Sequence, residues 1–132
     1  MDYCKIGGRS YDVLVVAIEE NFNILYSENT GRTMSRGAKM TLDPLGTFYG
    51  HKVTFRRKNG KEEEYDDLFD YVSRPRYDGI LVELVHNQST LEYNAYISQG
   101  TRALKRIDEK TDKVCWDEFS LNMVPMEAQV TP

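Results

Sequence analysis

Apolar and polar residues alternate along much of the chain, and this pattern predicts β-strands. Three stretches, 47–58, 91–98 and 114–124, place apolar side chains at every second position, as in a strand with one buried face. The segment from Val13 to Ile18 is instead a nearly continuous apolar run, which predicts a buried strand and leaves a helix as the competing interpretation. Shorter expected strands complete the set, at 4–6, 9–11, 40–45 and 79–86.

Glycine, asparagine and proline mark where these strands turn. Gly7-Gly8 predicts a two-residue hairpin between the two shortest strands, because glycine adopts positive φ at little steric cost. Asn59-Gly60 and the polar residues 87–90 predict two further turns. Pro44 has no N–H to donate to a sheet, so the strand that starts at residue 40 is expected to end there.

A single helix is predicted over 62–73. Tyr65, Leu68, Phe69 and Val72 follow the spacing that places side chains on one stripe of a helix. Its first turns carry acidic residues, which the helix dipole favours there: Glu62, Glu63, Glu64, Asp66 and Asp67. Pro75 follows closely and cannot continue the helix.

Together these elements predict one domain over residues 1–132 with a mainly β (α+β) fold. We expect an antiparallel β-sandwich or partly open barrel with one α-helix packed on it. The polar stretches 27–39 and 100–113 are expected to be connections, the first as a long exposed loop or a hairpin tip. No repeat or low-complexity segment divides the 132 residues.

Charge and composition narrow the classes of partner. The formal net charge is −4 at pH 7, whereas a nucleic-acid binder usually presents a basic surface to phosphates. We therefore expect no sequence-specific nucleic-acid partner. The sequence has neither an apolar stretch of bilayer-spanning length nor a signal-peptide layout at its start, so we expect no membrane partner and synthesis in the cytoplasm.

Residues that could carry chemistry are few and widely spaced. No phosphate-binding, dinucleotide, metalloprotease or serine-hydrolase motif occurs. Cys4, His51, His86 and Cys115 have no potential ligand partner within a few residues, although closed zinc sites usually include one closely spaced pair. The sequence therefore predicts no metal, no cofactor, no catalytic residue and no enzymatic activity, and an inert buried thiol at Cys115.

Two concentrations of basic residues are the candidate contact surfaces. One is the loop that carries Arg32, Arg36 and Lys39, and the other is Arg56-Arg57 with the following Lys58. Their expected partner is an acidic neighbour such as the start of the helix in another copy, while a solvated strand end and loop is the plainer interpretation. The candidate subunit-contact residues are Asn29, Gly31, Arg32, Arg36, Lys39, Arg56, Arg57, Glu62, Glu63 and Glu64.

The order of these segments resembles that of small tail proteins of long-tailed bacteriophages and prophages, with the tail-tube and distal-tail fold. The matching segments are Ile6-Gly7-Gly8, 29–33, Gly50–Phe55, Tyr65–Val72 and Trp116–Asn122 followed by 124–128. The chain departs from the family pattern in its adjacent Trp116-Asp117, in Asn122-Met123 and in lacking a leading tube-type segment.

The resemblance implies a structural component of a tail tube, tail tip or baseplate that assembles with copies of itself, commonly as a hexameric ring, and with other tail proteins. It implies a place in the virion tail after synthesis in the bacterial host cytoplasm, and no catalytic residues. The alternative is a soluble binding or inhibitor module that uses a β-sheet edge for one partner.

Overall fold

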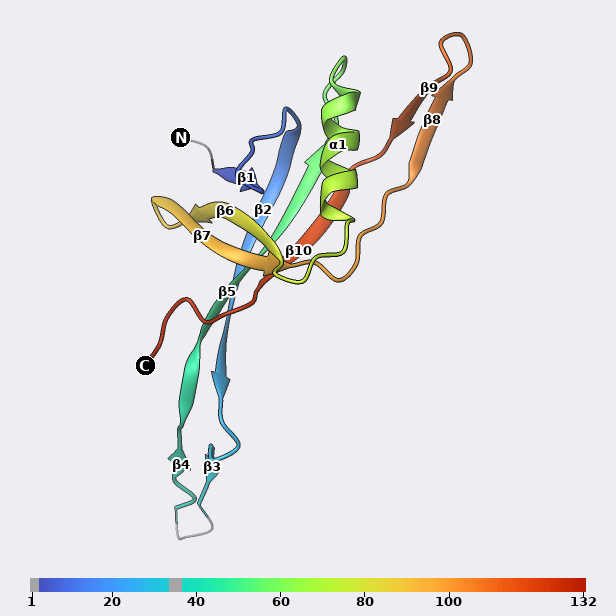
Figure 1. Cartoon of the computed structure of the whole chain (residues 1–132). Helices are drawn as coiled ribbons and strands as arrows, with labels where there is room; N and C mark the ends of the chain where they lie inside the picture. The colour runs from blue at the N-terminus through green and yellow to red at the C-terminus, as the bar shows by residue number, and fades with distance from the viewer. Residues whose placement is uncertain (1–2, 34–36) are drawn as a thin grey trace.

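The computed structural model describes residues 3–33 and 37–132 (Figure 1). Strands dominate it, and its one described helix is α1 (Glu62–Val72), within the predicted range. The strands are β1 (Cys4–Ile6), β2 (Leu14–Tyr26), β3 (Gly31–Arg32), β4 (Met40–Thr41), β5 (Pro44–Arg56), β6 (Ile80–His86), β7 (Ser89–Tyr96), β8 (Leu104–Asp108), β9 (Lys113–Trp116) and β10 (Phe119–Pro125).

Six of these strands form one antiparallel sheet in the order β1-β6-β7-β10-β5-β2. Two smaller antiparallel sheets pair β3 with β4 and β8 with β9. The mainly β, α+β fold with an antiparallel sheet and one helix is therefore confirmed. The choice between a sandwich and a partly open barrel stays a prediction.

The core lies where α1 packs against one face of the sheet. Tyr65, Leu68 and Val72 are the buried residues of α1, as their spacing predicted. Phe119 of β10 sits among three aromatic rings, with centroid distances of 5.2 Å to Tyr65 and 5.4 Å to both Phe55 and Phe69. The alternating residues of β5 also face this side, and His51, Val53 and Phe55 are all buried.

The prediction that residues 13–18 form a buried strand is wrong in its burial. Only Val13 is buried, and it precedes β2. Every residue of β2 is exposed except Ile18, which is half-buried. Because β2 is the last strand of the sheet, it has a neighbour on one side only, and its apolar side chains remain at the surface.

The short elements near the N-terminus are partly as predicted. Gly7 and Gly8 form the expected turn with φ of +63° and +77°. The strand expected over 9–11 does not form. In place of the expected hairpin pairing with residues 4–6, a single bridge joins Ile6 to Arg9. β1 pairs instead with β6, which offers a longer run of backbone partners.

Pro44 begins β5 and does not end the preceding strand, which is a second correction. It lies opposite Tyr26 at an irregularity of the β2–β5 ladder, where its missing N–H is tolerated. The preceding strand, β4, covers only Met40–Thr41. Of the stretch 27–39, the described residues 27–33 and 37–39 belong to a hairpin end, the second of the two alternatives, since β3 pairs with β4.

The C-terminal third departs most from the predicted elements. The connection expected over 100–113 contains β8, and the strand expected over 114–124 is divided into β9 and β10. All five residues of β8 are exposed, so no buried face imposes a visible alternation on its sequence. The turn expected over 87–90 shortens to Asn87-Gln88, because Ser89 pairs with His86.

Candidate functional site

The largest feature outside the core is a projecting hairpin formed by the far halves of β2 and β5. β10 pairs with β5 only from Phe55 to His51. Beyond that point, from Gly50 and the opposite Asn21 onward, the hairpin extends away from the body toward β3 and β4 (Figure 1). We call the described residues 21–33 and 37–50 the arm.

One edge of this hairpin is open along its whole length. β2 pairs with β5 from Leu14 to Tyr26 and is the terminal strand of the sheet. Its other side therefore has no strand partner within the described part of the chain. An edge of 13 residues offers a long row of backbone donors and acceptors to another chain.

The opposite edge of the arm is partly covered by the C-terminal segment. The N–H of Thr47 donates to the carbonyl of Val130 at 2.8 Å, and the N–H of Gln129 donates to the carbonyl of Thr47 at 3.0 Å. The amide side chain of Gln129 also bonds to both backbone groups of Tyr49, at 3.0 and 3.1 Å. This cover leaves β2 as the longer open edge.

Large apolar side chains stand exposed on the arm. Phe22 has 68% of its surface exposed, Leu42 58% and Leu45 51%. The further exposed apolar residues of the arm are Ile24, Leu25, Tyr26 and Met40. A two-stranded hairpin is marginal in water without an apolar face that packs on something, so this surface suits contact with another chain.

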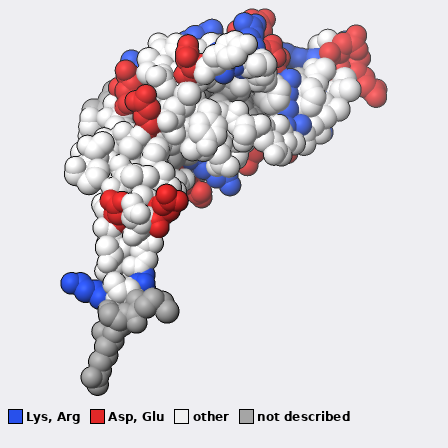
Figure 2. All heavy atoms as spheres, turned by 60° about the horizontal axis from the view of Figure 1, so that its bottom comes forward, with Lys and Arg blue, Asp and Glu red and all other residues white. Residues whose placement is uncertain are grey.

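Four of the ten predicted contact residues lie together at the end of the arm: Asn29, Gly31, Arg32 and Lys39. Gly31 and Arg32 form β3, and the N–H of Thr33 donates to the carbonyl of Lys39 at 2.9 Å, which brings Lys39 beside them. Asn29 lies in the adjoining turn, where its N–H bonds to the Ser27 hydroxyl at 3.1 Å. Basic side chains gather near this end (Figure 2), and Arg36 lies outside the described residues.

The other predicted contact residues lie at the opposite end of the molecule and mostly pair within the chain. Arg56 binds Glu118 at 3.0 Å, and Arg57 lies 4.0 Å from Glu62. Glu62 also lies 3.3 Å from the Nζ of Lys113. A backbone N–H and Lys113 together lower the pKa of Glu62, with burial opposing them.

The acidic end of α1 is therefore largely neutralised within one copy. Glu64 binds Arg9 at 2.6 Å, while Glu63 is exposed and makes no polar side-chain contact within the described part of the chain. The structure does not bring the basic end of the arm near α1. Contact between these two surfaces in different copies stays a prediction. Fewer carboxylates at the start of α1 are unpaired than the sequence suggested.

The two histidines, which lie in separate predicted strands, both bind Glu20. Glu20 Oε2 lies 3.0 Å from His51 Nε2 and 2.6 Å from His86 Nδ1. The buried His51 ring also reaches the carbonyl of Val85 at 3.0 Å and the hydroxyl of Tyr93 at 2.8 Å. These contacts join β2 and β5 to the β6–β7 hairpin. The pairing of β2 with β5 places Glu20 opposite His51 and so brings these side chains together.

The cysteines lie in settings that disfavour reactivity. Burial raises the pKa of the Cys4 thiol to about 12, so it stays protonated and weakly nucleophilic near neutral pH. Cys115 is buried on β9. Within residues 3–33 and 37–132, no group of three or more His, Cys, Asp or Glu side chains is arranged to hold a metal ion.

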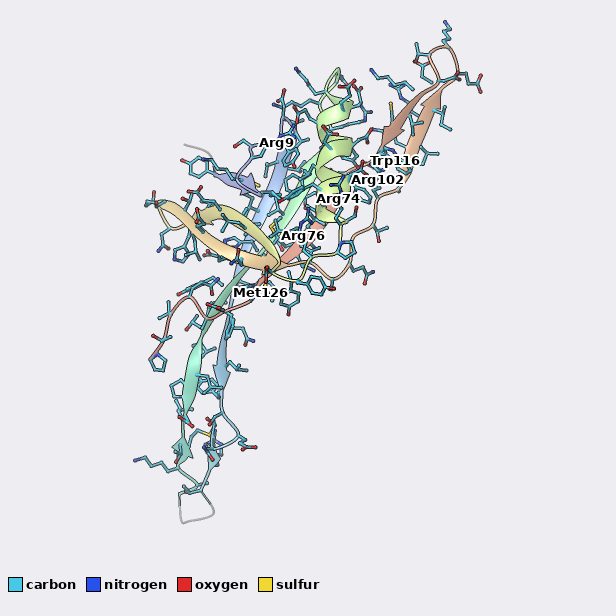
Figure 3. The ribbon with its side chains drawn as sticks, viewed as in Figure 1. Arg9, Arg74, Arg76, Arg102, Trp116 and Met126 are labelled. Atoms are coloured by element: carbon cyan, nitrogen blue, oxygen red, sulfur yellow. The ribbon has the colours of Figure 1, made fainter. Side chains whose placement is uncertain are left out.

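Beside α1 projects a second, shorter hairpin made of β8 and β9. Arg102, just before it, stacks 3.9 Å from the Phe69 ring and 4.2 Å from the Trp116 ring, and binds Asp66 at 3.1 Å (Figure 3). The N–H of Asp117, just after the hairpin, donates to the carbonyl of Ala103 at 2.8 Å. Both ends of this hairpin are thus held against the body.

Comparison of the chain with models of known protein families and with curated proteins finds no match. Among the described residues, no helix combines the length and the apolar character that crossing a bilayer requires.

Proposed function

We propose that this protein is a structural component of a bacteriophage or prophage tail, in the tube, tip or baseplate region. It acts by assembling with copies of itself and with other tail proteins. The observation that carries the proposal is the arm, which combines a long open strand edge with exposed large apolar side chains. This surface becomes stable and useful when another chain covers it.

Symmetric assembly makes such a surface effective. Each contact of an arm with a neighbour is modest, but a closed ring repeats it once per subunit. The arm extends well beyond the body (Figure 1), so it reaches past the nearest part of an adjacent copy. The order of sequence segments that resembles tail-tube and distal-tail proteins supports a hexameric ring and a location in the virion tail.

The test is the oligomeric state of the purified chain over a range of concentrations. Size-exclusion chromatography with light scattering should show assembly of the wild type, and electron microscopy should show rings. Phe22→Asp with Leu42→Asp places charge on the exposed apolar surface of the arm and should raise the dissociation constant of assembly by about tenfold or more. Leu81→Asp, at an exposed apolar position of β6 outside the arm, is the matched control.

The proposal fails if the wild type stays monomeric at all concentrations tested. A monomer that binds one different protein through β2 would instead support the binding or inhibitor module. Circular dichroism of the arm variant should match the wild type, because both substituted side chains are already exposed.

A further inference from the structure

A groove beside the C-terminal end of α1 has an apolar floor and a basic rim. Its volume is about 430 Å³. Buried side chains of three different elements, Val72, Ile80 and Leu121, form part of its lining, and Arg74 and Arg76 lie at its side. Both arginines are labelled in Figure 3. No aspartate or glutamate lines this groove.

The two arginines keep their charge available for a partner. Arg76 stacks on Tyr71, with its Cζ 4.1 Å from the ring centroid, and donates to the carbonyl of Arg74 at 3.0 Å. The Arg74 side chain is exposed and makes no hydrogen bond or ion pair within the described part of the chain. A groove of this kind selects an acidic segment that also carries an apolar side chain.

The end of the β8–β9 hairpin has that chemistry. Residues 108–112 hold three carboxylates and one lysine, and Ile107 beside them is 54% exposed. Figure 2 shows acidic side chains gathered at the far end of this hairpin. Glu109 makes no polar side-chain contact within the described residues, so its carboxylate is available.

The hairpin points away from the groove of its own chain. It projects beyond the upper part of α1, whereas the groove lies at the other end of this helix (Figure 1). The Arg102 contacts and the Asp117–Ala103 hydrogen bond hold the hairpin in that direction. A segment held outward in this way loses little conformational entropy on docking.

We infer that the β8–β9 tip of one copy docks into the Arg74/Arg76 groove of a neighbouring copy. Asp108 and Glu109 bind the two arginines, and Ile107 covers the apolar floor. This contact rests on the proposed function, since it joins copies of the chain within an assembly. It is head-to-tail, because the two surfaces that meet are different, and such contacts generate rings or filaments.

Charge reversal tests the inference without disturbing the core. Arg74→Glu with Arg76→Glu, and separately Asp108→Lys with Glu109→Lys, should each raise the dissociation constant of assembly by about tenfold or more. The chain that carries all four changes should recover assembly to within about threefold of the wild type, because the attraction is restored with its sign inverted. Sedimentation velocity at moderate salt measures all three constants.

Two controls accompany these variants. Lys52→Glu with Glu92→Lys reverses one charge of each sign at exposed strand positions outside the tip and the groove and should leave assembly unchanged. If the double groove variant has a lower melting temperature because the Arg76–Tyr71 stack is lost, Arg74→Glu alone replaces it in the assembly measurement.

The outcomes separate this inference from the proposed function. A wild type that never assembles contradicts the proposed function. A wild type that assembles while the four-change chain stays as weak as its parents contradicts the docking alone. Loss of assembly with the groove variant but not with the tip variant would also overturn it, since the groove would then hold a different acidic segment.

Discussion

The two ends of the β2–β5 hairpin are the same pair of strands in opposite surroundings. At the body end, β5 lies between β2 and β10, and its His51, Val53 and Phe55 side chains are buried. In the arm, the same ladder continues without α1, and Phe22, Leu42 and Leu45 are more than half exposed. Apolar side chains in the body stabilise the fold, whereas those in the arm are available for binding.

The sharpest test of this comparison is a matched pair of phenylalanine truncations. Phe119→Ala should lower the free energy of unfolding by about 3–5 kcal/mol, because it opens a cavity among Phe55, Tyr65 and Phe69. Phe22→Ala should change it by about 0.5 kcal/mol or less. Urea denaturation of the dilute chain measures both, and similar losses would contradict the division into body and arm.

The next largest effect should come from His51. His51→Leu leaves the Tyr93 hydroxyl and the Val85 carbonyl without their shared partner. This loss should lower the free energy of unfolding by about 2–3 kcal/mol. His86→Leu is the control, since its ring is partly exposed and loses the contact with Glu20 and the ring contact with Tyr49. It should cost about 0.5–1 kcal/mol. Equal losses in the two variants would show that burial of His51 does not matter.

A smaller effect is expected where the β8–β9 hairpin joins the body. Arg102→Ala removes the stacking on Phe69 and Trp116 and the ion pair with Asp66, and should cost about 1–2 kcal/mol. Arg102→Lys keeps the charge but not the planar stack, so it should lose most of the same free energy. Hydrogen exchange should rise in β8 and β9 and stay unchanged in the arm; a stable lysine variant would argue against stacking.

The last expected effect is an alkaline loss of stability at the body end. The pKa of Cys4 is raised from 9.0 to about 12 by burial, so the thiol favours the folded state fully below pH 9.0. That contribution is lost as pH rises toward about 12, because the unfolded chain releases its proton first. Burial also raises the pKa of Tyr93, which adds in the same direction.

Urea midpoints measured between about pH 8 and about pH 11 should therefore fall in the wild type and fall less steeply in Cys4→Ala. An identical slope in both proteins would show that Cys4 does not contribute. Cys115→Ala is the control for removal of a thiol.

Several elements could be predicted because their pattern is local. The stripe of Tyr65, Leu68 and Val72 specifies which side of α1 is buried, and the alternation in β5 specifies its inner face. β8 could not be found in this way, because all its residues are exposed and both its faces carry charged side chains. Of the candidate site, Arg32 and Lys39 were identified as exposed, but the arm that presents them was not.

What the sequence alone determined is the type of each well-patterned element and the mainly β class, since both follow from side chains a few residues apart. Only the tertiary structure decided that the apolar residues of β2 stay exposed, because exposure depends on which strand lies last in the sheet. The tertiary structure also brings Glu20, His51 and His86 together, and it gives the β8–β9 tip its outward direction. Each depends on packing between segments that are distant along the chain.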